Sequence, residues 1–370
     1  MEKKLEEIFF EVNERKHPEL PVLSIQQGIG TVFRDISERR ISYDKANINA
    51  YKVIEPGDFI IHLRSFEGGL ECSKHKGISS PAYKILRSNC IDSAAFKDYF
   101  RSYNFIEGKL AAAVTGIRDG KNIDMPTFWS LKINIPSLPE QKKIAAFFTL
   151  LDRRIQKQRQ LVERLKTYKR GVSEAIFERK FGFPNKTNWK KIKIQNLFSE
   201  RCERAIGNEE LLAVTINGGI QKRNEIQLKD NSSEDKSNYK RVHIGDIAYN
   251  TMRMWQGASG VSYYAGIVSP AYTVIVLKDK ENQCIDFWGH YFKHTNLIRT
   301  FQKFSQGLTS DTWNLKYTQL SQINLYVPEY KEQCAIANFL HKFDSKISIE
   351  EKKLSQLSIQ KKELLHRMFI

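Results

Sequence analysis

The chain has 370 residues, of which 41% are hydrophobic and 11% are aromatic. This is too long for one ordinary core, so we expect two or three folded domains rather than a disordered chain. The 59 Lys and Arg against 42 Asp and Glu give a formal charge of +17, which favours nucleic acid, or else an acidic protein surface, as the partner.

The cysteine pattern and the apolar pattern indicate the compartment. Five widely spaced cysteines argue against a disulfide framework. The sequence lacks an apolar run of about 18 residues, and its start, MEKKLEEIFF, is not shaped like a signal peptide. We therefore expect a soluble cytoplasmic protein that does not bind a membrane.

The first stretch in chain order, residues 1–139, has the pattern of a mixed α/β domain. β-rich runs occur at Val22–Ile25 and Phe59–Leu63, and the turn Gly57-Asp58 leads into the second run. We predict one helix in this stretch, around Ser93–Asn104.

Residues 140–180 have the pattern of a long helix and its linker. Pro136 ends the preceding strand, and Glu140 places a carboxylate in the first turn, where the helix dipole favours it. Apolar residues then alternate at spacings of four and three, which is a heptad seam. A helix of roughly 37 residues spans about 55 Å and needs a partner helix. The seam residues are Ile144, Phe148, Leu151, Ile155, Val162 and Leu165.

The second half of the chain repeats the first. Residues 135–177 align without a gap on residues 327–369 at an offset of 192, with eleven identities in 43 positions. Upstream, Gly245-Asp246 matches Gly57-Asp58, and the string SPAY occurs in both halves. We predict strands at Leu211–Ile216 and Ala271–Leu277 and one helix around Ile285–Lys303. The second seam consists of Ile336, Leu340, Phe343, Ile347, Leu354 and Leu357.

Both seams are interrupted by polar residues at matching positions. Gln158 matches Glu350, and Lys169 matches Lys361. This is the pattern of two helices packed together by a twofold. The predicted fold is α+β, with two pseudo-twofold-related mixed α/β domains and two long helices that pair with each other. The domains are residues 1–139 and 181–328, and the helical segments are residues 140–180 and 329–370.

Motifs for catalysis are missing from the sequence. It has no GxxxxGK[ST] loop, no HExxH and no methyltransferase tetrapeptide of the NPPY type. Gly28 and Gly30 follow a strand, but no helix signal follows them, which disfavours a dinucleotide site. Cys72, His75 and Cys90 could supply zinc ligands, but a buried thiol and a surface histidine are favoured. We expect no catalytic residue, no metal site and no cofactor.

These features resemble a known family. Two globular units, each closed by the pattern P-x-x-x-EQ-x-x-I-A and a long helix, look like the specificity subunit of a Type I restriction–modification enzyme. The pattern begins at Pro136 and at Pro328. The resemblance implies that each unit is a target recognition domain reading one half of a split sequence in double-stranded DNA. It further implies that the two helices form an antiparallel coiled coil that separates the recognition domains as a spacer. The helices would also dock two methyltransferase subunits, which would bind S-adenosylmethionine, and restriction/translocase subunits would join this core. In this sequence the lead-in Phe181–Trp189 precedes only the second unit, because the first begins at Met1, which aligns near Lys190.

Candidate DNA contacts lie in loops at matching positions of the two halves. Arg64 and Arg253 each leave a strand into a Gly-containing loop, where arginine can read guanine, hold a phosphate, or pair with Asp58 or Asp246 for purely structural reasons. Two polar loops, 115–122 and 306–314, add further candidates. The full set is Arg64, Arg118, Lys121, Asn122, Arg253, Trp255, Ser310, Thr312 and Asn314.

The sequence thus predicts a non-catalytic DNA-recognition subunit. The alternative is a two-domain coiled-coil scaffold or adaptor that binds acidic proteins without reading DNA sequence, and a single-chain nuclease or methyltransferase ranks third.

Overall fold

The computed structural model describes residues 1–34, 45–117, 121–182, 187–207, 209–216, 218–226, 233 and 235–368. The chain divides into two compact units. Unit 1 comprises Met1–Gln160 with Glu351–Ile370, and unit 2 comprises Leu161–Glu350. The two long helices, α6 (Leu138–Phe177) and α11 (Tyr330–Met368), therefore each contribute one part to each unit.

The strands of the two units pair in the same order. Each unit has an antiparallel four-stranded sheet, ordered β2-β9-β6-β7 in unit 1 and β14-β21-β18-β19 in unit 2. Each also has three strand pairs, β1-β12, β3-β4 and β5-β8 in unit 1 and β13-β22, β15-β16 and β17-β20 in unit 2. Unit 1 adds the hairpin β10-β11. The repeat in the sequence is thus a repeat of topology.

The bounds of the strands are as follows. In unit 1 they are β1 (Glu2–Lys4), β2 (Phe10–Val12), β3 (Leu23–Gln26), β4 (Gly30–Phe33), β5 (Lys52–Ile54), β6 (Phe59–Ile61), β7 (Glu71–Cys72), β8 (Gly77–Ser79), β9 (Lys84–Arg87), β10 (Val114–Thr115), β11 (Asn122–Ile123) and β12 (Lys132–Asn134). In unit 2 they are β13 (Lys190–Lys193), β14 (Phe198–Glu200), β15 (Leu212–Thr215), β16 (Gly219–Lys222), β17 (Lys240–Val242), β18 (Ile247–Asn250), β19 (Ser259–Val261), β20 (Gly266–Val268), β21 (Tyr272–Leu277) and β22 (Asn324–Val327). The four strands predicted from β-rich runs are confirmed as β3, β6, β15 and β21.

Short helices connect these strands. Unit 1 has α1 (Leu5–Ile8), η2 (Lys45–Ala50), α2 (Ser65–Gly68), α3 (Ser93–Phe96), η3 (Tyr99–Arg101), α4 (Tyr103–Ile106), η4 (Leu110–Ala113) and α5 (Met125–Ser130). Unit 2 has α7 (Ile194–Leu197), η6 (Arg223–Glu225), η7 (Met254–Gln256), α8 (Ile285–Tyr291), α9 (Thr295–Phe304) and α10 (Tyr317–Leu320).

The prediction of one continuous helix in each unit was wrong. Residues 93–106 form three short helices, and residues 285–304 form α8 and α9. The backbone becomes extended at Ser102, with ψ 153°, and at His294, with ψ 133°. Ser102 caps the helix that follows it, because its hydroxyl accepts from the Phe105 amide. These breaks turn the chain so that aromatic side chains of every segment reach one core.

That core is aromatic in both units and includes the long helices. In unit 1, Phe100 packs against Phe59 at a ring separation of 5.0 Å, and in unit 2 the equivalent Phe292 packs against Phe198 at 5.8 Å. The first turns of α6 and the last turns of α11 pack on the core of unit 1, through residues such as Phe148. The core of unit 2 likewise takes the end of α6 and the start of α11.

A buried glutamine joins each long helix to its domain. Gln141 is 1% exposed: its side-chain oxygen accepts from the Asp92 amide at 2.7 Å, and its amide donates to the Pro136 carbonyl at 3.0 Å. Gln333 makes the same two contacts, with the Cys284 amide at 3.0 Å and the Pro328 carbonyl at 2.9 Å. The glutamine of the EQ motif thus binds its own helix start and the start of the domain helix α3 or α8.

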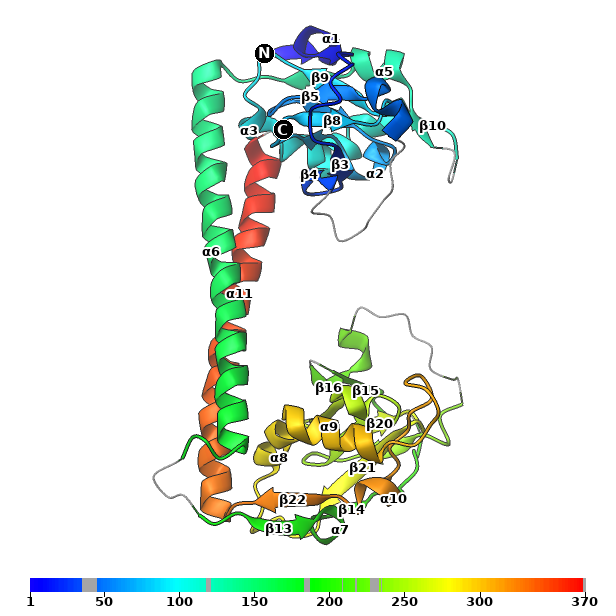
Figure 1. The fold of residues 1–370 in the computed structure, drawn as a ribbon, viewed down its shortest axis with the longest axis vertical. Helices are drawn as coiled ribbons and strands as arrows, with labels where there is room; N and C mark the ends of the chain where they lie inside the picture. The colour runs from blue at the N-terminus through cyan, green and yellow to red at the C-terminus, as the bar shows by residue number, and fades with distance from the viewer. Residues whose placement is uncertain are drawn as a thin grey trace. The chain divides into compact units, whose positions relative to one another are not determined.

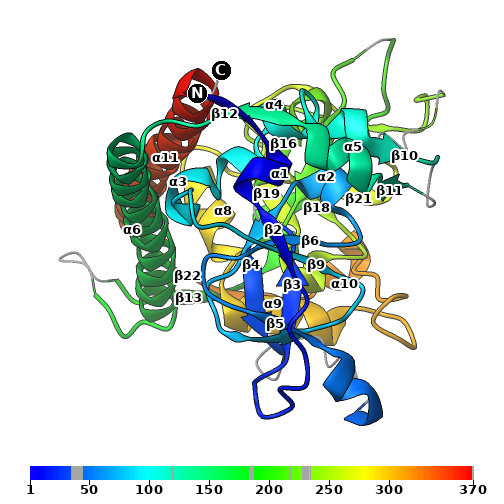
Figure 2. The ribbon, with the colours of Figure 1, turned by 90° about the horizontal axis from the view of Figure 1, so that it is seen from above.

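The long helices run antiparallel within each unit. In unit 1, Lys361 of α11 binds Asp152 of α6 at 2.6 Å, and in unit 2, Lys169 of α6 binds Asp344 of α11 at 2.5 Å. These two ion pairs are equivalent under the offset of 192. Figures 1 and 2 show α6 and α11 side by side. The lysines that interrupt the predicted seams are therefore matched with aspartates on the facing helix.

The seam residues of the long helices differ in how deeply they are buried. Those near the helix starts, Ile144 and Phe148 in unit 1 and Ile336 and Leu340 in unit 2, are buried in the domain cores. Val162 and Ile347 are buried farther along the helices. The remaining predicted positions are partly buried and comprise Leu151, Ile155, Leu165, Phe343, Leu354 and Leu357. Within the described ranges, neither the long helices nor any shorter one has the unbroken apolar length of a membrane span.

We predict that Lys361→Met destabilises the protein by about 2 kcal/mol at pH 7, because Lys361 also binds the buried Asp98 at 2.9 Å. Burial alone would raise the pKa of Asp98, but the charges of Lys361, Lys97 and Arg101 outweigh it and lower that pKa. A lowered carboxyl pKa stabilises the fold above the unfolded pKa, and this contribution is lost as pH falls through the folded value. The difference between wild type and variant should therefore shrink below about pH 4.

Urea unfolding at pH 7 and at pH 3 measures this difference. The matched control is Lys362→Met, which removes an exposed neighbouring lysine. Equal losses for both variants, or a difference that does not depend on pH, would contradict the assignment.

Candidate nucleic-acid interface

Two loops meet at the same place in each unit. In unit 1, α2 lies next to the β10-β11 hairpin, and the Lys121 ammonium stands 5.8 Å from the centre of the Phe66 ring. In unit 2, the loop around η7 meets residues 306–315: Trp255 and Trp313 contact edge to face at 5.2 Å, and the Leu315 amide donates to the Thr251 carbonyl. The structure therefore brings together the two segments that the sequence singled out in each half.

The unit 1 candidates that the structure describes, Arg64, Lys121 and Asn122, are exposed. Arg64 immediately precedes α2, and its backbone amide donates to His62. Asn122 lies in β11 and pairs with Thr115. Arg118 lies outside the described residues.

The unit 2 candidates occupy the equivalent loops. Arg253 is exposed and precedes η7, and the indole of Trp255 donates to the Met252 carbonyl at 3.0 Å. Ser310 and Thr312 are exposed, and the Thr312 hydroxyl donates to the Thr309 carbonyl. Asn314 bridges to Gln306 through its backbone, and its side-chain oxygen is buried without a hydrogen-bond partner among the described residues.

The aspartates of the two Gly-Asp turns form ion pairs with arginines other than Arg64 and Arg253. Asp58 is bound by Arg87 through two contacts of 2.7 and 2.8 Å, and Asp246 is bound by Arg201 at 2.7 and 3.2 Å. Both carboxylates are buried and also accept an amide of their own turn. The ion pairs of Arg64 and Arg253 with these aspartates, considered from sequence, are not the ones that form.

The two arginines come from different strands. Arg87 lies at the end of β9, whereas Arg201 directly follows β14, the counterpart of β2. Because β2 and β9 are neighbours, an arginine on either strand reaches the same carboxylate. Alignment of the repeats could not have found this, since the two residues do not align.

In unit 2 a lysine side chain connects two of these loops by hydrogen bonds, and an arginine lies at the equivalent position of unit 1. Lys293 donates to the Ile216 carbonyl at 2.8 Å and to the Gly257 carbonyl at 2.5 Å, which ties the β15-β16 turn to the η7 loop. Burial, with a smaller effect of Lys169, lowers the pKa of Lys293 to about 8. Gly257 has φ +80°, and an added Cβ would lie 2.9 Å from Ile298, so glycine is required at this contact.

In unit 1 the equivalent connection runs through a glutamate side chain. Arg101, at the position equivalent to Lys293, contacts Glu71 at 3.4 Å, and Glu71 accepts from the Gly28 amide of the β3-β4 turn at 2.6 Å. Glu71 is fully buried. Sequence reasoning missed Arg101 and Lys293, although extending the offset of 192 to this segment would have aligned them.

The other motifs considered from sequence have local roles. Gly28 and Gly30, with φ +80° and +96°, lie in and just after the β3-β4 turn. The Cys72 thiol is buried, which raises its pKa to about 11. His75 contacts the Thr31 carbonyl, and the Cys90 thiol contacts the Ile8 carbonyl, so these three side chains have separate partners.

Comparison with known proteins identifies the family. The family model described as "Type I restriction modification DNA specificity domain" matches residues 93–167 and 186–358. The chain belongs to this family. Membership makes it a DNA-specificity subunit rather than an enzyme in its own right, and it places the chain among the subunits of Type I restriction–modification systems. No curated protein sequence matches it significantly.

Solved structures of specificity subunits share its fold. The HsdS subunit from Thermoanaerobacter tengcongensis is 15% identical, with a TM-score of 0.51 over 100% of this chain and 96% of that one. The Type I S subunit from M. genitalium is 14% identical, with a TM-score of 0.54 over 100% and 96%. A chain from a study of the assembly and conformational transition of a type I R-M system is 15% identical, with a TM-score of 0.58 over 99% and 96%.

We predict that Lys293→Met loosens both braced loops, because two carbonyls lose their donor. Amide hydrogen exchange in peptides covering 212–222 and 250–260 should accelerate about tenfold, which corresponds to roughly 1.4 kcal/mol of local opening. Lys303→Met, at an exposed site late in α9, is the control and should leave both peptides unchanged. Unchanged exchange in the Lys293 variant would show that the brace contributes nothing.

Proposed function

We propose that this specificity subunit reads a bipartite DNA target, with one half-site recognised by each unit. Residues 1–139 and 181–328 act as the target recognition domains, and residues 140–180 and 329–370 form the spacer helices. The subunit docks two methyltransferase subunits, which bind S-adenosylmethionine, and restriction/translocase subunits, in the cytoplasm.

The observation that supports the proposal is the pair of loops at the same place in both units. Each pair carries an exposed arginine, Arg64 or Arg253, that lies two residues before an aromatic residue in the sequence. The arginine fork matches the O6 and N7 acceptors of guanine, and nearby lysine and hydroxyl groups suit phosphates. The strands below these loops repeat in order, whereas the loop residues do not, as expected of two readers of different sequences.

Among the residues that the structure describes, neither the Arg64 nor the Arg253 side chain forms a hydrogen bond or an ion pair. The buried carboxylates that could have neutralised Arg64 and Arg253 are already bound by Arg87 and Arg201. Their guanidinium groups are therefore available to an anionic partner, and the formal charge of +17 strengthens attraction to DNA over the whole chain.

We predict that Arg64→Ala combined with Lys121→Ala relaxes recognition of one half-site only. Loss of a base-reading contact costs about 1–3 kcal/mol, so discrimination at that half-site should fall by roughly 5- to 150-fold. Arg253→Ala combined with Asn314→Ala should affect only the other half-site. Methylated bases mapped in the host genome define the target, and fluorescence anisotropy of the assembled complex on duplexes scrambled in either half measures the discrimination.

The controls remove exposed lysines from other strands, with Lys132→Ala in unit 1 and Lys191→Ala in unit 2. They should change the salt dependence of binding at most slightly and leave discrimination intact. Relaxation of both half-sites by one pair of substitutions would refute independent reading. A wild-type complex without preference for any duplex would favour the scaffold alternative.

We also predict that the helices set the length of the unread DNA between the half-sites. One heptad inserted after Gln158 and another after Glu350 lengthen the helices by about 10.5 Å each, equal to about three base pairs of B-DNA. Each insertion falls between the ion pairs Asp152–Lys361 and Lys169–Asp344 along its helix, so both pairs can still form. The spacer in the methylated target should lengthen by up to three base pairs.

Two comparison variants test whether the paired helices need equal length and a continuous apolar seam. A single heptad after Gln158 leaves the partner helix short and should destabilise the protein. Two residues inserted at each site rotate the seam by about 200° and should prevent assembly. A stable, doubly extended protein that methylates the original target would mean that the helices do not act as a ruler.

A further inference from the structure

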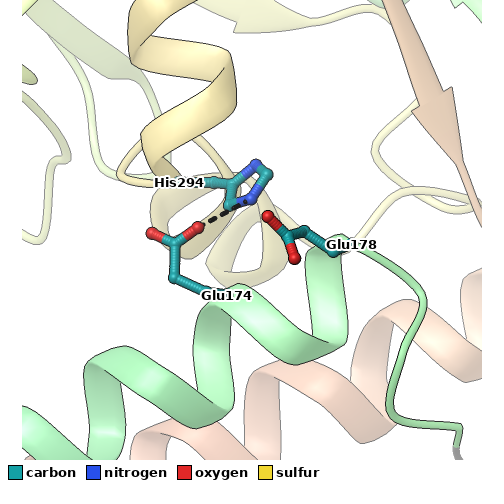
Figure 3. A group of neighbouring side chains, drawn as sticks. All are labelled: Glu174, Glu178 and His294. Carbon is teal, nitrogen blue, oxygen red and sulfur yellow. Dashed lines mark ion pairs between the residues drawn. The ribbon is translucent and has the colours of Figure 1, made fainter.

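A histidine and two glutamates converge in unit 2 where the end of α6 meets the start of α9. Glu174 lies in the last turn of α6, Glu178 directly follows that helix, and His294 directly precedes α9. One ligand atom from each residue lies within 4.8 Å of the others, and they form the one such group found within the described part of the chain. Figure 3 shows the His294 ring directed at both carboxylates.

The His294 ring is buried, and its Nε2 atom pairs with Glu174 as an ion pair without the geometry of a hydrogen bond. The residue is 6% exposed, and its Nε2 atom has no hydrogen-bond partner among the described residues. Nε2 lies 2.9 Å from Glu174 Oε2, but the two groups are not aligned as a hydrogen bond.

This close approach suits a shared positive ion. Two ligands bound at about 2.1 Å to one tetrahedral ion lie about 3.4 Å apart. The Nε2 and Oε2 atoms, which are 2.9 Å apart, need to separate by only about 0.5 Å to bind the same ion.

The equivalent junction of unit 1 does not need such a cluster. There Ser102 occupies the position of His294 and caps α4 with its hydroxyl, and His366 of α11 occupies the position of Glu174 and contacts Asn104 at 2.6 Å. In unit 2, His294 makes no cap hydrogen bond, and Glu174 Oε1 instead accepts from the Thr295 amide and hydroxyl. The histidine is thus directed away from the helix that it precedes and toward the acidic side chains.

We propose that Glu174, Glu178 and His294 bind one divalent transition-metal ion, for which Zn²⁺ is the best match. One imidazole nitrogen and two carboxylate oxygens form a donor set typical of zinc, with water completing the coordination. Glu174 can use Oε2 for the ion while Oε1 continues to cap α9. The ion would fasten the domain of unit 2 to the end of α6.

Glu178 has two competing contacts, which set the expected affinity. It accepts from the Asn296 side chain at 3.0 Å and pairs with Lys180 at 2.6 Å. Lys180 is 73% exposed and can turn into solvent when an ion binds. Asn296 can stay in place, because a carboxylate oxygen accepts more than one contact.

The test measures Zn²⁺ bound to the full chain after treatment with EDTA, by equilibrium dialysis and elemental analysis. Wild type should bind one equivalent of Zn²⁺ more than His294→Ala, and Glu178→Gln should weaken that site at least tenfold. Zn²⁺ in large excess over its Kd should raise the unfolding temperature of wild type by roughly 5 °C and that of His294→Ala by much less. Co²⁺ at the site should give visible absorption bands that both variants lose.

The matched control is His243→Ala. His243 also lies 3.0 Å from a carboxylate, Glu203, but this pair is exposed and has no third ligand. The control should keep the full equivalent of Zn²⁺, and zinc held by any of the five cysteines is common to all variants. Equal Zn²⁺ binding by wild type, His294→Ala and Glu178→Gln would overturn the proposal. If His294→Ala fails to fold, the result for Glu178→Gln decides alone.

Discussion

The buried glutamine at the start of each long helix is the contact on which the arrangement of each unit depends. Gln141 and Gln333 each bind two backbone groups inside their domain. One is the carbonyl of the proline before the long helix, and the other is the amide of the residue that directly precedes a domain helix. An unpaired backbone group at such depth costs about 1–3 kcal/mol, so the long helix can leave its domain in one direction only. The direction of the helices thus follows from a side chain inside the domain.

The glutamate that precedes this glutamine also lies in the first turn of each long helix, but its hydrogen-bond partners differ between the two units. Glu140 accepts from the amide and hydroxyl of Ser137, three residues before it, whereas Glu332 accepts from Thr187 and Trp189 of the segment before β13. In both units a carboxylate lies at a helix N-terminus, where the dipole favours it. In unit 2 the same contact also fastens the incoming chain. Equivalent residues therefore keep their physical role while their partners change.

The sequence was sufficient to predict the repeat, the strands next to the Gly-Asp turns and the two long helices, because each depends on periodicity within one segment. It was insufficient for contacts between segments. The helix after Ser102 is capped by the Ser102 hydroxyl, whereas the helix after His294 is capped by Glu174 from another segment. Both breaks also allow Phe100 and Phe292 to enter the cores, and a helical sequence pattern reveals neither effect. Arg87 and Arg201 could not be recognised as equivalent, because they reach equivalent aspartates from neighbouring strands. The loops chosen as candidates do meet in space, but which side chains contact DNA depends on a partner whose shape is not encoded in the spacing of these residues.

The lysines that interrupt the seams give the helix pair its register. A purely apolar seam can slip by one heptad at little cost, since every seven residues present the same face. Lys169 and Lys361 are largely buried, and each loses its aspartate partner if the helices slip. An unpaired buried charge is far more costly than an unpaired leucine, so the polar positions disfavour every register but one. Because the two ion pairs are equivalent under the repeat, a single slip would break both. Register is therefore specified by charge, while the apolar residues on either side supply the burial that holds the helices together.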